Sequence, residues 1–228
     1  MPTRFQHFPP EPKSKECENA YSILCNAHDA ASSFLDIFEI VRRDRGAKGM
    51  PTDEEQDLLR AMLTFAAAGL DSMAKQLVTD ALPRVIERDP GATQMLKQFI
   101  ERRLKRADEI DRRFLADTLG DPQPRARLMA QFVADLTGGS LQSTEELLRV
   151  AAAFNIKSSD ICNDTRNLSL IFEARNQIAH EMDIDFRQAK RTRRPRAKEL
   201  MTGFTNTLFE ISANFLAHAD GKLTQQEQ

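Results

Sequence analysis

An arginine, an asparagine and a histidine lie close together in the stretch Glu173-Ala-Arg-Asn-Gln-Ile-Ala-His180. On a helix, Arg175 and His180 lie about one and a half turns apart. A guanidinium binds a phosphate group, and an imidazole transfers a proton near neutral pH. These two groups suffice to cleave RNA, because RNA supplies its own nucleophile, the ribose 2′-hydroxyl. Arg175, His180 and the adjacent Asn176 are therefore candidate catalytic residues, and their pattern contains no metal-ligand spacing.

A helix expected to run from Ser158 or Ser159 to about Met182 must position these residues. An unpaired buried guanidinium is costly, and the helical period places Arg175 near the middle of an apolar face. Arg175 therefore requires an acidic partner, a bound anion or an opening in the core. The expected apolar face comprises Leu168, Ile171, Phe172, Ile178, Ala179 and Met182.

Two acidic residues, Glu173 and Asp71, are candidates for supporting roles. Glu173 lies two turns before His180, and Asn176 lies one turn before it, so both are placed to orient the imidazole. Asp71, on an earlier predicted helix, is a candidate partner for Arg175. The alternative is that Asp71 merely faces solvent.

The segment 187–198 contains seven basic residues and no acidic residue. One interpretation is a solvated loop followed by the start of a helix, because most charge runs are of that kind. The other is a strip that makes salt-sensitive contacts with the phosphates of RNA near His180. The candidate RNA-binding residues are Arg187, Lys190, Arg191, Arg193 and Arg194, and the run continues with Arg196 and Lys198.

The composition favours a globular chain without a strong overall charge. Of the 228 residues, 41% are hydrophobic and 29% are charged, with a formal net charge of −2, so affinity for RNA would have to come from local patches. We expect no membrane span and no secretory signal, since no apolar run is long enough. Cys17, Cys25 and Cys162 form no CxxC pattern, which fits a reducing cytoplasm. Nothing in the sequence indicates a metal or another cofactor.

Helical periodicity extends over most of the chain and predicts an all-α fold. We expect a flexible tail over 1–15, a single domain over 16–220 and a frayed C-terminus over 221–228. Within the domain, one helix is expected over about 15–45, and a second begins at the capping box Thr52-Asp-Glu-Glu55 and is interrupted near Pro83. An insertion of two or three shorter helices is expected over about 90–138. A further helix begins at Ser143, and the last covers about 195–218.

Three segments of the chain resemble the HEPN superfamily, and in particular its RiboL-PSP-HEPN branch. Arg175-Asn-Gln-Ile-Ala-His180 is similar to the superfamily signature, an arginine followed after four to six residues by a histidine, and the similarity continues to Asp183. Ser140–Leu147 resembles a second segment of that branch, and the alanine-rich stretch Leu59–Asp71 resembles a third. Asp71 stands where many members have glutamate.

The resemblance implies an HEPN-like helical bundle, here with a helical insertion, and metal-independent endoribonuclease activity. It also implies a homodimer whose two motif helices meet at a shared active site. Many superfamily members act in toxin–antitoxin or anti-phage defence systems, so an antitoxin or another defence protein is an expected partner.

Two alternatives to an endoribonuclease stay open. One is a catalytically inactive HEPN module that binds RNA, a nucleotide or a protein. The other is a structural interaction protein in which Arg175 is bridged within a closed core.

Overall fold

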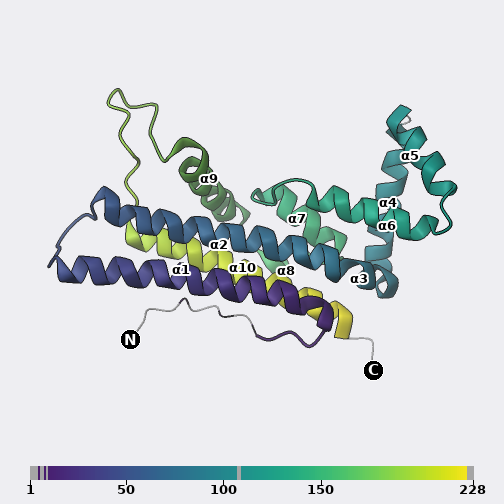
Figure 1. Cartoon of the computed structure of the whole chain (residues 1–228), viewed down its shortest axis with the longest axis horizontal. Coiled ribbons are helices and arrows are strands. Elements are labelled where there is room, and N and C mark those ends of the chain that lie inside the picture. Colours follow the sequence, from purple (N-terminus) through teal and green to yellow (C-terminus); the bar gives the residue numbers. More distant parts are fainter. Residues whose placement is uncertain (1–4, 6–7, 9, 107–108, 225–228) are drawn as a thin grey trace.

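Three long helices form the frame of the molecule. The computed structural model describes residues 5, 8, 10–106 and 109–224, and these residues are helical and irregular apart from one isolated bridge, Ile184–Arg193, so the predicted all-α class is confirmed. Helices α1 (Glu18–Asp44), α2 (Asp53–Asp80) and α10 (Lys198–Thr224) run alongside one another, as Figure 1 shows. A single 3₁₀ turn, Lys15–Cys17, precedes α1.

Local signals in the sequence fix both ends of α2. The Thr52 hydroxyl accepts a hydrogen bond from the backbone N–H of Glu55, while the Glu55 carboxylate accepts one from the N–H of Thr52 at 2.8 Å, so the predicted capping box is confirmed. Pro83 lies in the first turn of α3 (Leu82–Arg88), where its missing N–H costs no helical bond. The predicted interruption is therefore confirmed.

Small residues let α1 and α2 approach closely in the core. A Cβ added at Gly69 would lie 2.3 Å from the Cβ of Ala27 on α1. Large side chains fill the remaining space between the long helices, and Phe38, Phe209 and Phe215 are fully buried. This frame gives α9 a rigid surface to cross.

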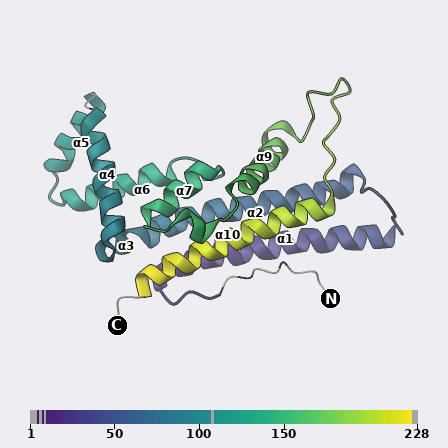
Figure 2. The same ribbon diagram turned by 180° about the vertical axis from the view of Figure 1, so that it is seen from behind.

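Shorter helices project from one end of this frame (Figures 1 and 2). The segment for which the sequence predicts two or three helices contains α4 (Pro90–Arg106), α5 (Glu109–Leu119) and α6 (Pro124–Thr137). The rings of Phe99 on α4 and Phe132 on α6 pack at a centroid distance of 5.1 Å. Helices α7 (Thr144–Ala153) and α8 (Ser158–Ile161) then lead to α9 (Thr165–Glu181), which carries the motif.

The start of the motif helix differs from the prediction. Ser158 begins the short α8, whereas α9 begins at Thr165. The Asp164 carboxylate accepts hydrogen bonds from the N–H groups of Arg166 and Asn167, at 3.1 and 2.9 Å. A side-chain acceptor at this position stabilises a new helix start, so Asp164 determines where α9 begins.

The two ends of the chain are also more ordered than expected where the structure describes them. Helix α10 continues past Gly221 to Thr224, because Lys222 pairs with Asp89 at 2.7 Å and Leu223 is buried. Phe5, in the expected flexible tail, is buried against Phe209 at a ring-centroid distance of 5.4 Å. The other parts of the two expected flexible ends that fall on 1–4, 6–7, 9 and 225–228 lie outside the described residues.

Membrane-spanning helices are absent from the described part of the chain, where none is both long and apolar enough to cross a bilayer.

Candidate active site

The predicted apolar face of α9 is buried only along its first half. Leu168, Ile171 and Phe172 are buried, but Ala179 is exposed and Met182 is 66% exposed. Helix α9 crosses α2 obliquely, so its second half extends beyond the underlying helix (Figures 1 and 2). Arg175 lies where the covered part gives way to the exposed part and is half-buried.

Arg175 brings together the three residues of the motif. Its Nη1 donates a hydrogen bond to the Asn176 Oδ1 at 3.0 Å and contacts the His180 Nε2 at 3.4 Å. Asn176 and His180 are both exposed, so solvent or a ligand reaches this cluster. We call Arg175, Asn176 and His180 the motif centre. The structure therefore brings together the predicted catalytic residues.

The guanidinium of Arg175 is partly desolvated and has no carboxylate paired with it among the described residues. Its Nε is a buried atom without a hydrogen-bond partner there. Burial lowers the pKa of Arg175 from its ordinary value, and the negative charge of Asp71 acts in the opposite direction. A partly desolvated positive charge without a paired carboxylate favours a bound anion, because the anion supplies the compensating negative charge.

Asp71 acts on Arg175 only at longer range, so the expected pairing is not a direct ion pair. Its Oδ1 accepts a hydrogen bond from the backbone N–H of Leu141 at 2.6 Å, and its Oδ2 pairs with Lys75 at 2.9 Å. Asp71 therefore also fixes the loop that leads into α7. Asp71 also does not merely face solvent, the other alternative, because both of its carboxylate oxygens have partners.

The imidazole of His180 is not held in the way expected from the helical spacing. Asn176 accepts from Arg175, and Glu173 accepts from the Gln177 Nε2 at 3.0 Å. Neither residue has a hydrogen bond to His180 in the described part of the chain. The long side chain of Arg175 reaches the imidazole instead.

Asp183 is an important residue that the sequence reasoning did not single out. Its carboxylate is fully buried and accepts hydrogen bonds from the Nε of Arg60 on α2 at 2.8 Å and from the Nε and Nη2 of Arg196 at 2.9 and 2.5 Å. Met182 and Asp183 both have positive φ, 51° and 60°, and form the turn that ends α9. These contacts attach the end of α9 to α2. The sequence does contain one signal for such a buried carboxylate: Arg60 is a charged residue between the apolar residues Leu59 and Met62 and therefore needs an acidic partner.

Part of the basic segment has a structural role. Arg193 pairs with Asp57 at 2.5 Å, and this hydrogen bond lowers the pKa of Asp57. Arg194 pairs with Glu181 at 2.9 Å. Arg196 is buried on Asp183, and Lys198 pairs with Glu39. The remaining basic side chains are exposed and have no ion pair in the described part of the chain: Arg187, Lys190 and Arg191.

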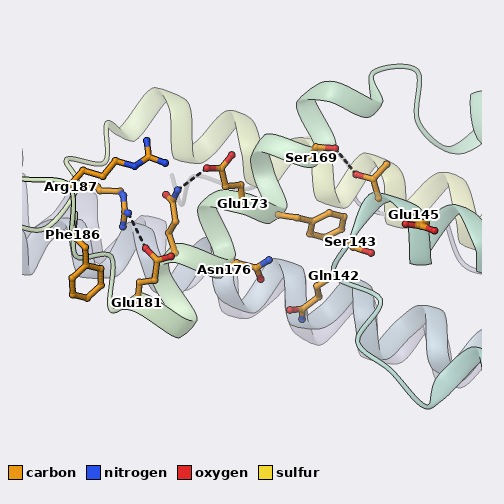
Figure 3. A pocket seen from close by; sticks show the side chains of 13 residues that line it. Gln142, Ser143, Glu145, Ser169, Glu173, Asn176, Glu181, Phe186 and Arg187 are labelled. Carbon is orange, nitrogen blue, oxygen red and sulfur yellow. Dashed lines mark hydrogen bonds and ion pairs between the residues drawn. The ribbon is translucent and has the colours of Figure 1, made fainter.

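A groove of about 680 Å³ lies beside the motif centre. One side is α9, with Asn176 on its wall, and the other is the start of α7, beginning at Gln142. Phe186 and Arg187, from the segment after α9, line one end, and Figure 3 shows them away from Gln142. Asn176 belongs to both the groove and the motif centre. The sequence reasoning missed Gln142 and Phe186, although an aromatic residue at the head of a basic segment is a detectable signal.

Comparisons with known proteins identify no relative. No protein-family model matches the chain, and neither a curated protein nor a solved structure is significantly similar to it. Among the described residues, no three His, Cys, Asp or Glu side chains gather as a metal ion would require. The function of the chain is therefore inferred from the geometry of the site.

Proposed function

We propose that the chain is a metal-independent endoribonuclease of HEPN type. The observation that supports this most is the 3.4 Å contact between Arg175 Nη1 and His180 Nε2 on an exposed part of α9. One group suited to bind phosphate and one suited to transfer a proton therefore lie within reach of the same phosphodiester. The partly desolvated guanidinium adds to this support, because a phosphate would balance a positive charge that no carboxylate pairs with among the described residues.

The proposed reaction uses the ribose of the substrate as the nucleophile. A phosphate draws Arg175 away from His180 and leaves the Nε2 lone pair free. His180 then removes the proton from the 2′-hydroxyl, the 2′-oxygen attacks the adjacent phosphorus, and the bond from phosphorus to the 5′-oxygen breaks. Arg175 stabilises the negative charge that develops on the phosphorane. The products are a 2′,3′-cyclic phosphate and a 5′-hydroxyl.

A second proton donor completes the reaction. The departing 5′-oxygen needs a proton, which the His180 of a second copy or a water molecule supplies. In the dimeric arrangement, two motif helices share one active site.

Light scattering on the active protein is expected to give twice the chain mass of 25.8 kDa. A fully active protein at the single-chain mass would contradict the shared site.

The proposed setting is cytoplasmic, in a toxin–antitoxin or anti-phage defence system. A nuclease that attacks cellular RNA needs control, so an antitoxin or another defence protein is the expected partner.

Substitution of the motif centre tests the proposal. We expect His180→Ala and Arg175→Ala each to lower the rate of RNA cleavage in EDTA by at least about 100-fold, because one side chain transfers the proton and the other stabilises the phosphorane. The measurement is gel-resolved cleavage of mixed RNA by purified protein.

Matched controls are available in the same chain. His218, on α10, and Arg166, near the start of α9, are exposed and lie outside the motif centre, so their alanine variants are expected to cleave normally. Undiminished cleavage by either motif variant would contradict the mechanism.

A catalytically inactive HEPN module is the second candidate. Arg187, Lys190 and Arg191, which are exposed and have no ion pair with any described residue, would bind RNA without cleaving it. Salt-sensitive RNA binding by a wild-type protein that does not cleave would favour this candidate.

A further inference from the structure

Most polar side chains in the groove beside the motif centre already have partners. Gln177 donates to Glu173 and accepts from the Nη2 of Arg196 at 2.9 Å. The Ser143 hydroxyl accepts from the backbone N–H of Glu146 at 3.2 Å and caps α7. Figure 3 shows further pairs, Thr144 with Ser169 and Glu181 with Arg194. These contacts hold the walls of the groove in place.

Gln142 is an exception among these groove residues. The side chain is only 9% exposed, and its Oε1 is a buried acceptor without a hydrogen-bond partner in the described part of the chain. A buried carbonyl oxygen without a donor is destabilising, and native structures seldom contain one without a reason. The backbone next to Gln142 is anchored, because the N–H of the preceding residue, Leu141, is bonded to Asp71 at 2.6 Å. The oxygen itself is covered, so the Gln142 side chain must turn into the groove for a donor of a ligand to satisfy it.

Three further groups define the chemistry of that ligand. The Asn176 Oδ1 accepts from Arg175, which leaves the Nδ2 available as a donor on the groove wall. The ring of Phe186 is 58% exposed and lines the groove without a ring partner among the described residues. Arg187 adds an exposed guanidinium with no ion pair there. The groove thus offers an acceptor, a donor, an aromatic face and, at the end where Arg187 lies, a positive charge, while the carboxylates of Glu145, Glu173 and Glu181 also line it.

These groups match the parts of a single-stranded nucleic acid. The edge of a base carries hydrogen-bond donors and acceptors, its face stacks on aromatic rings, and the backbone carries phosphates. The volume of about 680 Å³ lies within the range of sites that bind small organic molecules, roughly 300–1,000 Å³. Bases in an A-form duplex are stacked and paired, so their faces could not reach Phe186.

We propose that this groove holds unpaired bases of the RNA strand next to the bond that the motif centre cuts. Gln142 Oε1 and Asn176 Nδ2 read the edge of one base, Phe186 stacks on another, and Arg187 contacts the phosphate between them or beside them. The link to a scissile bond rests on the proposed nuclease function. Asn176 couples the two sites, since its oxygen accepts a hydrogen bond from Arg175 and the residue also lines the groove. The substrate class is therefore single-stranded RNA.

Binding of an RNA that cannot be cleaved tests this proposal. The probe is a short, fluorescein-labelled, single-stranded 2′-O-methyl RNA of mixed sequence, whose blocked 2′-oxygen cannot attack, and the readout is fluorescence anisotropy. We expect Phe186→Ala to weaken binding about 5- to 150-fold, the range for loss of base stacking. Gln142→Leu is expected to weaken it about fivefold, as for a neutral hydrogen bond. A fully paired 2′-O-methyl duplex should bind the wild-type protein more weakly than the single strand.

Two controls separate a loss of the groove from a loss of the fold. Phe186→Tyr keeps an aromatic ring and should recover most of the binding that Phe186→Ala loses. Leu170→Ala removes a similarly exposed apolar side chain from α9, outside the groove, and should also bind normally. Thermal unfolding of each variant, followed by circular dichroism, checks that α-helical structure is retained.

The outcomes separate this proposal from the nuclease proposal. Unchanged binding by both Phe186→Ala and Gln142→Leu, or equal binding of duplex and single strand, would overturn the groove assignment even if the wild-type protein cleaves RNA. Weakened binding by both variants, together with no cleavage by the wild-type protein, would support the groove as an RNA site and reject the nuclease.

Discussion

Two arginines interrupt apolar helix faces in this protein, and they have opposite surroundings. Arg60 on α2 is buried and paired with the equally buried Asp183 at 2.8 Å. Arg175 on α9 is half-buried, and its side chain contacts the neutral oxygen of Asn176 and the imidazole of His180, with no paired carboxylate among the described residues. A buried ion pair of the first kind holds elements together, whereas a desolvated guanidinium without a carboxylate is suited to bind an anion. This contrast is the reason for assigning chemistry to Arg175 and a structural role to Arg60.

Helical spacing predicted which motif residues meet, but it did not predict their partners. Arg175 and His180 lie five positions apart on one helix, about 140° apart around its axis, and the long side chain of Arg175 spans this separation. Asn176 was expected to hold His180, yet the longer and charged side chain of Arg175 takes its oxygen. The contact of Asp71 with Leu141 joins residues 70 positions apart. Distances between helices of this kind depend on packing, which spacing along one helix does not determine.

At the scale of the elements, the end of α9 is held by the turn that follows it. Asp183 receives hydrogen bonds from Arg60 on α2 and from Arg196, just before α10, and Arg60 also donates to the backbone carbonyl of Arg194 at 3.0 Å. One carboxylate thus joins the ends of two helices to the side of a third. His180 lies three residues before this junction, so the junction limits the movement of the imidazole.

We expect Asp183→Asn to destabilise the fold by about 3–5 kcal/mol, because it removes the negative charge between two buried arginines. The measurement is the free energy of unfolding from urea denaturation. Asp185→Asn is the matched control: Asp185 lies two residues later and accepts from the backbone N–H of Arg187 and from Gln188, and no described arginine side chain is bound to it. Its expected loss is about 1 kcal/mol or less. Equal losses for the two variants would show that the junction contributes no more than an ordinary loop contact.

The bounds of the elements were predictable where a local signal determines them. The Thr52 capping box and Pro83 predicted the limits of α2, because capping and proline act within one turn. The start of α9 was placed too early, since Ser158 and Asp164 are both capable of capping a helix. The end of α10 was placed too early because its last turn depends on distant contacts, including the pair of Lys222 and Asp89.

At the scale of the whole molecule, the long helices separate two projecting parts. Helices α4 to α6 lie at one end of the frame, and α9 with its following loop points away from it toward the other end (Figures 1 and 2). Periodicity predicted the all-α class and an inserted group of helices, but it gave no information on this separation. The motif centre and the groove therefore belong to the α7–α9 region and do not involve α4 to α6.

The groove extends the site beyond the three residues of the motif centre. Its walls come from α9, from the segment directly after α9 and from the start of α7, which precedes α9 in the sequence and meets it only in the folded chain. Asn176 connects this surface to Arg175 and His180. A substrate strand lying in the groove would therefore reach the motif centre without a rearrangement of the helices.

The central claim is that the 2′-hydroxyl of RNA is the nucleophile in a reaction at Arg175 and His180. The chemical identity of the ends that cleavage leaves on the RNA fragments tests it most directly. Purified protein is incubated in EDTA with a single-stranded RNA and with a matched strand in which every ribose is 2′-deoxyribose, and the products are analysed by mass spectrometry. We predict fragments with 2′,3′-cyclic phosphate and 5′-hydroxyl ends from the RNA and no cleavage of the deoxy strand, because the 2′-hydroxyl is the nucleophile. Fragments with 5′-phosphate ends, or cleavage of the deoxy strand, would contradict the mechanism assigned to Arg175 and His180.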